Sequence, residues 1–120
     1  MGAKMQRQLK KCPAAFYQSP NGIEPVREWL QTFSKADRTV LGKDIATVEY
    51  GWPIGMPVCK PLSAGLWEIR SSLPSKREAR IIFCVLKERI ILLHGFIKKT
   101  QKTPAKELKL AISRKKEIET

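Results

Sequence analysis

Several residue types and motifs that carry chemistry in small proteins are scarce in this sequence. It has one histidine, His94, and three widely spaced cysteines, Cys12, Cys59 and Cys84, without a CxxC pair or a neighbouring histidine. This pattern indicates neither a zinc site nor a disulfide framework, so we expect the cysteines to fill the core. A P-loop, a GxGxxG turn and a Ser-His-Asp arrangement are also absent from the sequence. Any chemistry would depend on lysine, arginine and hydroxyl side chains.

Long apolar runs and acidic residues are scarce as well. No stretch approaches the roughly 20 apolar residues of a membrane-spanning helix, and residues 1–11 lack the apolar stretch of a signal peptide. We therefore expect a cytoplasmic protein without a membrane partner. Only 11 Asp and Glu oppose 23 Lys and Arg, which gives a formal net charge of +12. A charge of this size favours a polyanionic partner, either nucleic acid or the ribosome.

The hydrophobic residues that are present predict a single α+β domain. With 120 residues, 42% of them hydrophobic, the chain has the size for one domain, 1–120, around one core. The spacing of the apolar residues, with the positions of proline and glycine, sets the expected elements. In order they are a strand over 14–17, a two-helix hairpin that starts at Pro25 and ends at Gly51, a loop over 52–65, three strands over 66–71, 79–86 and 89–97, and a basic helix from Pro104. We expect the three later strands to form an antiparallel meander that joins the first strand in one sheet.

Basic side chains should converge at one edge of this meander. The end of one antiparallel strand lies beside the start of the next, so Arg70 should approach Arg80. The last strand ends at the same edge and brings Lys98 and Lys99 with it. Like charges held this close cost free energy unless an anion lies between them, which favours a phosphate site. The alternative is that these residues are solvated strand ends that protect a sheet edge.

Strand alternation bears on His94, since histidine is the side chain best suited to proton transfer near neutral pH. A two-residue turn at positions 87 and 88 would place Arg80 opposite Gly95 and on the same face as Lys99. The same register places His94 opposite Ile81, on the other face. We therefore expect a hydrogen-bonded histidine in or near the core, although a β-bulge would reverse this conclusion.

Three further side chains have both a structural and a functional interpretation. Glu68 shares a strand face with Arg70, and we expect it to pair with that arginine rather than to act as a catalytic carboxylate. Trp29 and Trp67 could stack on bases, but their positions in the helix and strand patterns favour the core. The final helix is either an arm that binds nucleic acid or a solvated surface, and its sequence leaves both open.

Three segments carry a resemblance to a known family: GLWEIR at 65–70, RIIF at 80–83 and LLHGFIKKTQKTP at 92–104. In this order they closely resemble the phage-derived Gp49-like branch of the RelE/HigB toxin superfamily. The likeness covers nearly the whole chain and is most specific over 66–104. It implies a RelE-like fold and a type II toxin of a toxin–antitoxin system. Such a toxin is an endoribonuclease, or mRNA interferase, that needs no metal or other cofactor.

The resemblance also implies partners. The toxin would enter the A site of the 30S subunit, cleave mRNA on the ribosome and inhibit translation until a helix-turn-helix antitoxin protein neutralises it. The 2′-OH of one nucleotide would attack the adjacent phosphate, a nucleophile that only RNA has. The alternatives are a non-catalytic RNA- or ribosome-binding module on the same fold, and a degenerate toxin that retains only its antitoxin-binding role.

Residues carry over from the family one by one. Arg80 resembles the family's phosphate-binding strand arginine, Lys98 or Lys99 its basic position after the last strand, and Lys60 a lysine of a loop in related toxins. Related toxins often have a Tyr or His near the C-terminus as acid or base, and this chain has neither after residue 94. Thr100, Gln101, a lysine or His94 would have to substitute. The expected catalytic residues are Arg80, Lys98, Lys99, Arg70 and Lys60, and the expected RNA-binding residues are Lys102, Gln101, Lys106 and Lys109.

Overall fold

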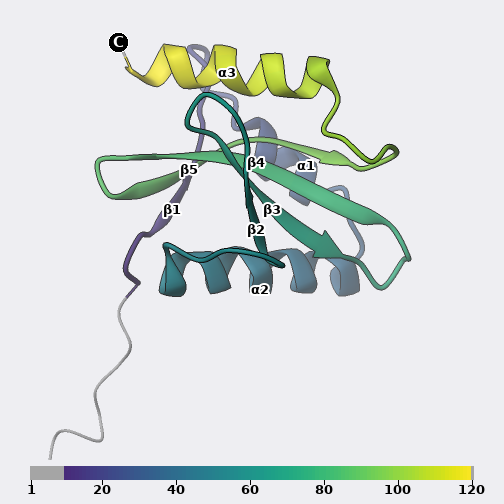
Figure 1. Cartoon of the computed structure of the whole chain (residues 1–120). Coiled ribbons are helices and arrows are strands. Elements are labelled where there is room, and N and C mark those ends of the chain that lie inside the picture. The colour runs from purple at the N-terminus through teal and green to yellow at the C-terminus, as the bar shows by residue number, and fades with distance from the viewer. Residues whose placement is uncertain (1–9, 120) are drawn as a thin grey trace, which may run out of the picture.

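The computed structural model describes residues 10–119 and has the expected mixed α+β composition, with one five-stranded sheet and three helices (Figure 1). Of residues 1–11, which lack the apolar stretch of a signal peptide, positions 1–9 lie outside the described residues. The elements are β1 (Ala14–Phe16), α1 (Pro25–Leu30), α2 (Lys35–Gly51), β2 (Cys59–Pro61), β3 (Trp67–Ser72), β4 (Glu78–Leu86), β5 (Arg89–Ile97) and α3 (Ala105–Glu119). Each predicted element is present, and β2 is an additional one.

The sheet has the strand order β1-β5-β4-β3-β2. Strands β3, β4 and β5 form the predicted antiparallel meander, and β1 extends the sheet by pairing parallel to β5. The additional strand β2 pairs antiparallel with β3 at the opposite edge, within a segment that we expected to be loop throughout. The strand was not predicted because proline usually interrupts strands. Proline is tolerated here because β2 lies at the edge of the sheet. This correction moves Lys60 from a loop onto the sheet.

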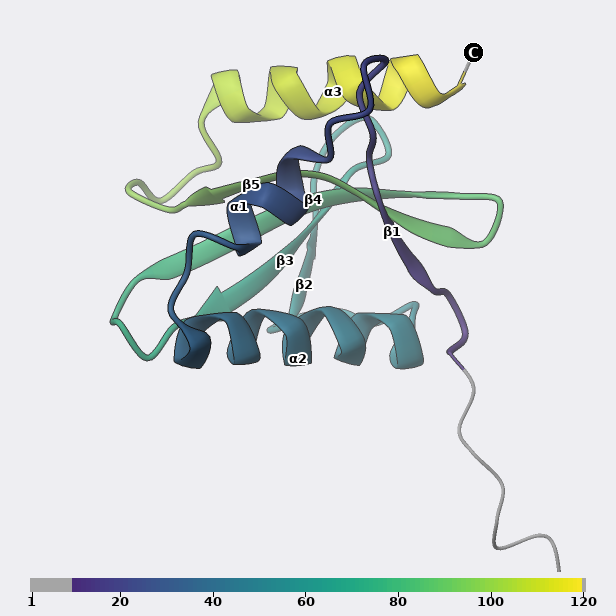
Figure 2. The same ribbon diagram turned by 180° about the vertical axis from the view of Figure 1, so that it is seen from behind.

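Helices cover both faces of the sheet, with α1 and α2 on one side and α3 on the other (Figures 1 and 2). Val26, Leu41 and Val48 of the first two helices pack in one core cluster with Ile81 and Phe83. A second cluster lies under α3, where Ala111 is buried with side chains from β4 and β5. Alternation along each strand therefore divides its side chains between an α1/α2 face and an α3 face.

The predicted two-helix hairpin is wrong. Helix α1 has six residues and packs mainly on β5 and β1, whereas α2 packs mainly on β3. Ser34 separates them, because its side chain caps α2 by accepting a hydrogen bond from the backbone N–H of Asp37 at 3.2 Å. The apolar spacing that suggested a longer first helix continues through Phe33, which lies in the connection and still packs in the core.

The β4–β5 hairpin contains a β-bulge that changes the predicted register. Lys87 and Glu88 form the expected tight turn, both in the left-handed region with φ of 52° and 61°. The pairing is as expected from the turn to Phe83 and Leu92, but Ile82 then pairs with His94, so one residue of β5 is left over. Beyond the bulge the predicted pairs are wrong by one residue.

The extra residue is Leu93, and the surrounding structure accommodates it. Its side chain is buried in the cluster under α3, and its carbonyl accepts a hydrogen bond from Arg114 of α3 at 2.7 Å. His94 also faces α3, where its Nε2 lies 2.7 Å from Oε1 of Glu107. Two consecutive side chains thus point to the same face, and Gly95 turns to the other side, against Trp29 of α1.

Two buried carboxylates fasten the sheet to its surroundings. Asp37 of α2 accepts hydrogen bonds from the Ser75 backbone N–H at 3.1 Å and from Arg77 at 3.2 Å, which joins α2 to the β3–β4 turn. The hydrogen bond from Ser75, more than the Arg77 guanidinium, lowers the pKa of Asp37. At the other end of α2, Glu49 accepts a hydrogen bond from the Ala14 backbone N–H at 2.7 Å.

The three cysteines are buried, as the sequence predicted. Desolvation raises the pKa of both Cys59 and Cys84 to about 11, so their thiols stay protonated at neutral pH. Trp29 and Trp67 also pack against the core.

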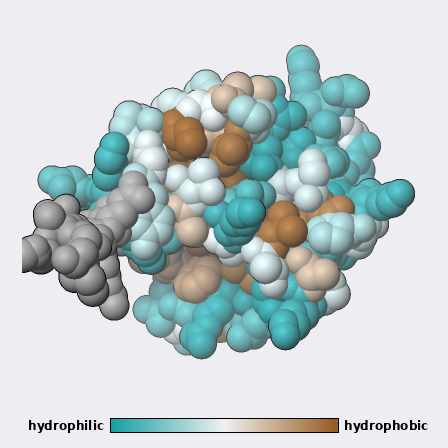
Figure 3. All heavy atoms as spheres, turned by 90° about the horizontal axis from the view of Figure 1, so that it is seen from below, coloured by the Kyte–Doolittle hydropathy of each residue, from teal (hydrophilic) through white to brown (hydrophobic). Residues whose placement is uncertain are grey.

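Among residues 10–119 no helix is long and apolar enough to cross a membrane, and no three His, Cys, Asp or Glu side chains form a group that could hold a metal ion. On the surface at the α2 side, apolar residues form separate patches among hydrophilic ones (Figure 3).

Candidate functional site

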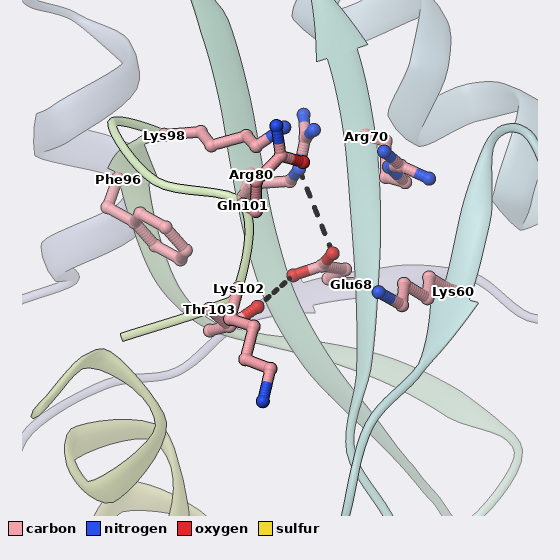
Figure 4. A pocket seen from close by; sticks show the side chains of 9 residues that line it. All are labelled: Lys60, Glu68, Arg70, Arg80, Phe96, Lys98, Gln101, Lys102 and Thr103. Atoms are coloured by element: carbon pink, nitrogen blue, oxygen red, sulfur yellow. Dashed lines mark hydrogen bonds and ion pairs between the residues drawn. The ribbon is translucent and has the colours of Figure 1, made fainter. Parts of the chain in front are cut away.

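The α3 face of the sheet is covered unevenly. Helix α3 packs on β5 and β4, and beside it the polar side chains of β2, β3 and β4 gather in a pocket (Figure 4). The segment between β5 and α3 closes one side of this pocket. The lining residues are Lys60, Glu68, Arg70, Arg80, Phe96, Lys98, Gln101, Lys102 and Thr103.

Strand register explains why these side chains meet. Arg70 pairs with Arg80 across β3 and β4, which confirms the predicted approach of the two arginines, and Arg80 pairs in turn with Phe96 of β5. In the neighbouring row Lys60 pairs with Glu68 across β2 and β3. Cross-strand partners point to the same face of a sheet, so both rows face the α3 side. Phe96 takes the place opposite Arg80 that the unbulged register gave to Gly95.

Arg80 lies buried in the pocket wall, with 3% of its surface exposed. Its Nη1 donates a hydrogen bond to the carbonyl of Ala79 at 2.9 Å. The carboxylates of Glu68 and Glu78 lie 3.7 and 3.6 Å from guanidinium nitrogens, close enough for ion pairing but too far for good hydrogen bonds. A guanidinium has five N–H donors, and one of those of Arg80 is used in the hydrogen bond to Ala79.

Glu68 lies at the centre of the site, 3% exposed. We expected it to pair with Arg70, but the structure pairs it with Arg80 instead. Its second carboxylate oxygen accepts a hydrogen bond from the Thr103 hydroxyl at 2.9 Å, so the carboxylate spans the distance between β4 and the segment after β5 (Figure 4). The sequence could not indicate this contact, because it depends on how residues 98–104 fold back over the sheet.

The basic segment after β5 divides its side chains between two sides. The backbone N–H of Lys98 donates to the Glu78 carbonyl at 2.7 Å, which extends the β4–β5 pairing and directs the Lys98 side chain into the pocket. Lys99, predicted to join it, does not line this pocket. It is exposed and lines one hollow with Lys106 and Glu107 and another with Lys98 and Gln101. Gln101 and Lys102 return to the pocket as the chain turns toward α3. Of the predicted α3 contacts, Lys106 and Lys109 are exposed outside the pocket.

The pocket has a strong positive charge. Five cationic side chains and one carboxylate line it, a formal balance of 5 − 1 = +4. Among the described residues, four of these cations have no carboxylate partner within ion-pair distance: Lys60, Arg70, Lys98 and Lys102. The enclosed volume is about 10 Å³, room for roughly one water molecule. A phosphate group therefore needs the exposed lysine side chains to move outward, which long flexible side chains do readily.

His94 stays outside the pocket although the bulge turns it to the same face. It continues the row of Lys60, Glu68 and Ile82 onto β5, two strands from Glu68, which corresponds to roughly 10 Å. Its ring pairs with Glu107 and stacks on Phe96 with centroids 5.8 Å apart. The predicted face was wrong, but the structure does contain the predicted hydrogen-bonded histidine near the core, and its side chain is partly buried.

A comparison with family models identifies the chain. The model described as Phage derived protein Gp49-like (DUF891) matches residues 28–116, which include every residue that lines the pocket. This family is related to the RelE/HigB-like toxins. No curated protein matches the chain. Because the matched segment covers most of the sequence, the chain belongs to the Gp49-like family of phage-derived proteins, a toxin-related family.

Proposed function

We propose that this protein is the toxin of a type II toxin–antitoxin system and a metal-independent endoribonuclease of the RelE/HigB superfamily. In this proposal it cleaves mRNA in the A site of the 30S subunit and so inhibits translation in the cytoplasm. The observation that carries the proposal is the pocket in which five cations surround one buried carboxylate. Membership of a toxin-related family supports it independently.

The pocket chemistry suits attack of a 2′-OH on the adjacent phosphate. The five-coordinate phosphorus in the transition state has more negative charge than the starting diester, and fixed cations stabilise that charge. Arg80 is held in place by β4 and offers several N–H donors in one plane, a geometry that matches phosphate oxygens. Arg70, its partner across the strands, supplies a second guanidinium. Lys60, Lys98 and Lys102 would then follow the RNA backbone.

The proposed partner outside the ribosome is a small helix-turn-helix antitoxin, which the toxin-related family supports. A neighbouring gene that encodes such a protein is the simplest test of this part. If co-expression of that protein does not relieve growth arrest by the toxin, the pairing is wrong.

The decisive experiment compares two variants under induction, with primer extension on cellular mRNA. Arg70→Ala removes a half-exposed cation from the pocket, whereas Lys99→Ala removes an exposed cation outside it. We expect Arg70→Ala to lower cleavage on the order of 10²-fold, the typical effect of losing one charge-stabilising donor, and Lys99→Ala to cleave at nearly the wild-type rate. Equal cleavage by the two variants would mean that the catalytic pocket is assigned wrongly.

A second candidate is a non-catalytic RNA- or ribosome-binding module. The exposed cations favour it, because Lys60 and Lys102 can hold an RNA backbone at the surface while a site with room for about one water molecule stays closed to a phosphate. This function predicts tight, salt-sensitive binding to ribosomes without new 5′ ends in mRNA. A degenerate toxin that retains only antitoxin binding predicts neither cleavage nor growth arrest when the antitoxin gene is deleted.

A further inference from the structure

One carboxylate lies among the five cations of the pocket, and the phosphate binding described above assigns it no role. Glu68 is the acidic residue that lines this pocket, and it is almost fully buried. A buried carboxylate in an anion site weakens anion binding through like-charge repulsion. Its presence therefore requires a reason other than affinity for phosphate.

The structure fixes Glu68 from two sides. One carboxylate oxygen lies 3.7 Å from Nε of Arg80, and the other accepts the Thr103 hydroxyl hydrogen bond at 2.9 Å. Strand β3 holds its backbone between β2 and β4. The carboxylate therefore has a set position beside the guanidinium that would hold the scissile phosphate, as a group that exchanges a proton at that phosphate must have.

We propose that Glu68 is the proton acceptor for the attacking 2′-OH, an inference that rests on the proposed ribonuclease function. Other candidates fit less well. His94 lies outside the pocket and pairs with Glu107. The lysines and arginines of the pocket, in the cationic form that binds phosphate, have N–H donors and no free lone pair. Gln101 and Thr103 have no basic group.

The proposed step balances as follows. The 2′ oxygen forms a bond to phosphorus while its proton passes to a carboxylate oxygen of Glu68, and the bond from phosphorus to the 5′ oxygen breaks. The products are a 2′,3′-cyclic phosphate and a free 5′-OH. The departing 5′ oxygen takes its proton from water, and the resulting hydroxide returns Glu68 to its carboxylate form.

The cationic surroundings reconcile this role with the position of Glu68. With a formal balance of +4, the pocket would keep an excess of positive charge with an anionic phosphate beside the anionic carboxylate. When a phosphate takes up donors of Arg80, the loose ion pair at 3.7 Å is easily given up. Thr103 keeps the carboxylate in place, so one oxygen stays fixed while the other, on the Arg80 side, takes up the proton.

The test measures single-turnover cleavage of mRNA on programmed ribosomes across a range of pH for wild type, Glu68→Gln and Glu68→Asp. Glutamine has the shape of glutamate and can still accept the Thr103 hydrogen bond, but it does not take up a proton. We expect Glu68→Gln to lower the cleavage rate about 10²- to 10⁴-fold and to bind the programmed ribosome at least as tightly as wild type. The acidic limb of the pH profile should disappear in Glu68→Gln and persist, at a reduced rate, in Glu68→Asp.

Glu49→Gln is the matched control, because Glu49 is also buried and ion-paired but lies on α2, outside the pocket. It should cleave at the wild-type rate. A substrate whose leaving 5′ oxygen is replaced by sulfur needs no proton on departure, and it should leave the Glu68→Gln defect unchanged.

The outcomes separate the inference from the proposed function. If wild type cleaves and folded Glu68→Gln cleaves equally fast, Glu68 is not the proton acceptor and the ribonuclease function stands. If Glu68→Gln loses ribosome binding but keeps the acidic limb, Glu68 only positions Arg80, and the inference is overturned. Rescue by the sulfur leaving group would make Glu68 a proton donor instead. A wild type that leaves mRNA intact overturns the proposed function and this role with it.

Discussion

Substitution of Gly95 tests the bulged register, on which the arrangement of the pocket depends. A Cβ added at Gly95 would lie 2.4 and 2.5 Å from Cε3 and Cζ3 of Trp29 and 3.0 Å from its Cδ2. Carbon atoms in contact are normally about 3.5–4.0 Å apart, so the indole ring would have to retreat by roughly 1 Å. Trp29 cannot do this freely, because its ring packs edge-on against Phe33 with centroids 4.8 Å apart. Gly95→Ala should therefore force α1 away from the sheet.

The magnitude follows from the cost of overpacking a core. Extra methyl groups in well-packed interiors cost about 1–3 kcal/mol, and the gain of about 0.5–1 kcal/mol from replacing a strand glycine offsets part of this. Contacts of 2.4 and 2.5 Å place the cost at the upper end of this range, so we expect Gly95→Ala to lower the free energy of unfolding by about 2 kcal/mol. For a domain of this size that corresponds to a fall in Tm of roughly 5–10 °C.

Urea denaturation and thermal melting measure this effect, with Gly42→Ala as the control. Gly42 lies in α2, and a Cβ there would have no neighbouring atom within 4 Å. This variant should gain about 0.5–1 kcal/mol, because alanine favours the helix. Replacement of glycine by alanine should thus lower the free energy of unfolding at position 95 and raise it at position 42.

Equal stability of Gly95→Ala and wild type would refute the reasoning. In the unbulged register Gly95 would lie opposite Arg80 on the pocket face, and the added methyl group would impair cleavage rather than folding. Loss of activity without loss of stability would therefore support the unbulged register. Loss of stability together with full activity of the folded fraction supports the bulged register.

Three further predictions concern groups away from the reacting phosphate. His94→Gln should lower the free energy of unfolding by about 1 kcal/mol, because its contact with α3 is lost, as thermal melting would show. Cleavage by the folded protein, measured by primer extension, should be nearly unchanged. A large loss of cleavage by folded protein would mean that His94 belongs to the catalytic site. Cys59 and Cys84, with pKa values near 11, should not react with a thiol reagent at pH 8 in the native state and should react in urea; native labelling would contradict their burial. Hydrogen bonding, chiefly from Ser75, lowers the pKa of Asp37, so its stabilising effect is present above its ordinary pKa of 3.8 and is lost as the pH falls through the folded-state value. The stability difference between wild type and Asp37→Asn should therefore narrow in acid, and a constant difference would contradict this linkage.

The sequence predicts elements well where the pattern is strong and local. The hairpin turn at Lys87 and Glu88 and the end of α2 at Gly51 are both correct, because each depends on neighbouring residues alone. Strand β2 was missed because prolines obscure it, and the end of α1 because its apolar spacing continues past the last helical residue. The bulge was not predictable from alternation, since it depends on which side chains α3 and α1 present to the two faces.

The candidate site was predictable to a similar extent. The approach of Arg70 to Arg80 follows from the meander and is unaffected by the register error, because the bulge lies in the β4–β5 pairing and the β3–β4 pairing is regular. Which of Lys98 and Lys99 lines the pocket, and the inward position of Thr103, depend on a connecting segment without regular structure. Charge composition identifies that segment as basic, but only its path determines which lysines share the pocket.

The bulge at Leu93 also bears on how relatives of this chain should be aligned. It divides the β4–β5 hairpin into an outer half that ends at Phe83 and Leu92 and an inner half that begins at Ile82 and His94. Arg80 and Phe96, the hairpin residues that line the pocket, both lie in the inner half, so residue pairs added at the turn would leave their pairing unchanged. A single deletion at Leu93, in contrast, would exchange the two faces of the inner half and turn Phe96 away from Arg80. Positions in relatives are therefore best matched by counting from the inner half toward α3 rather than from the hairpin turn.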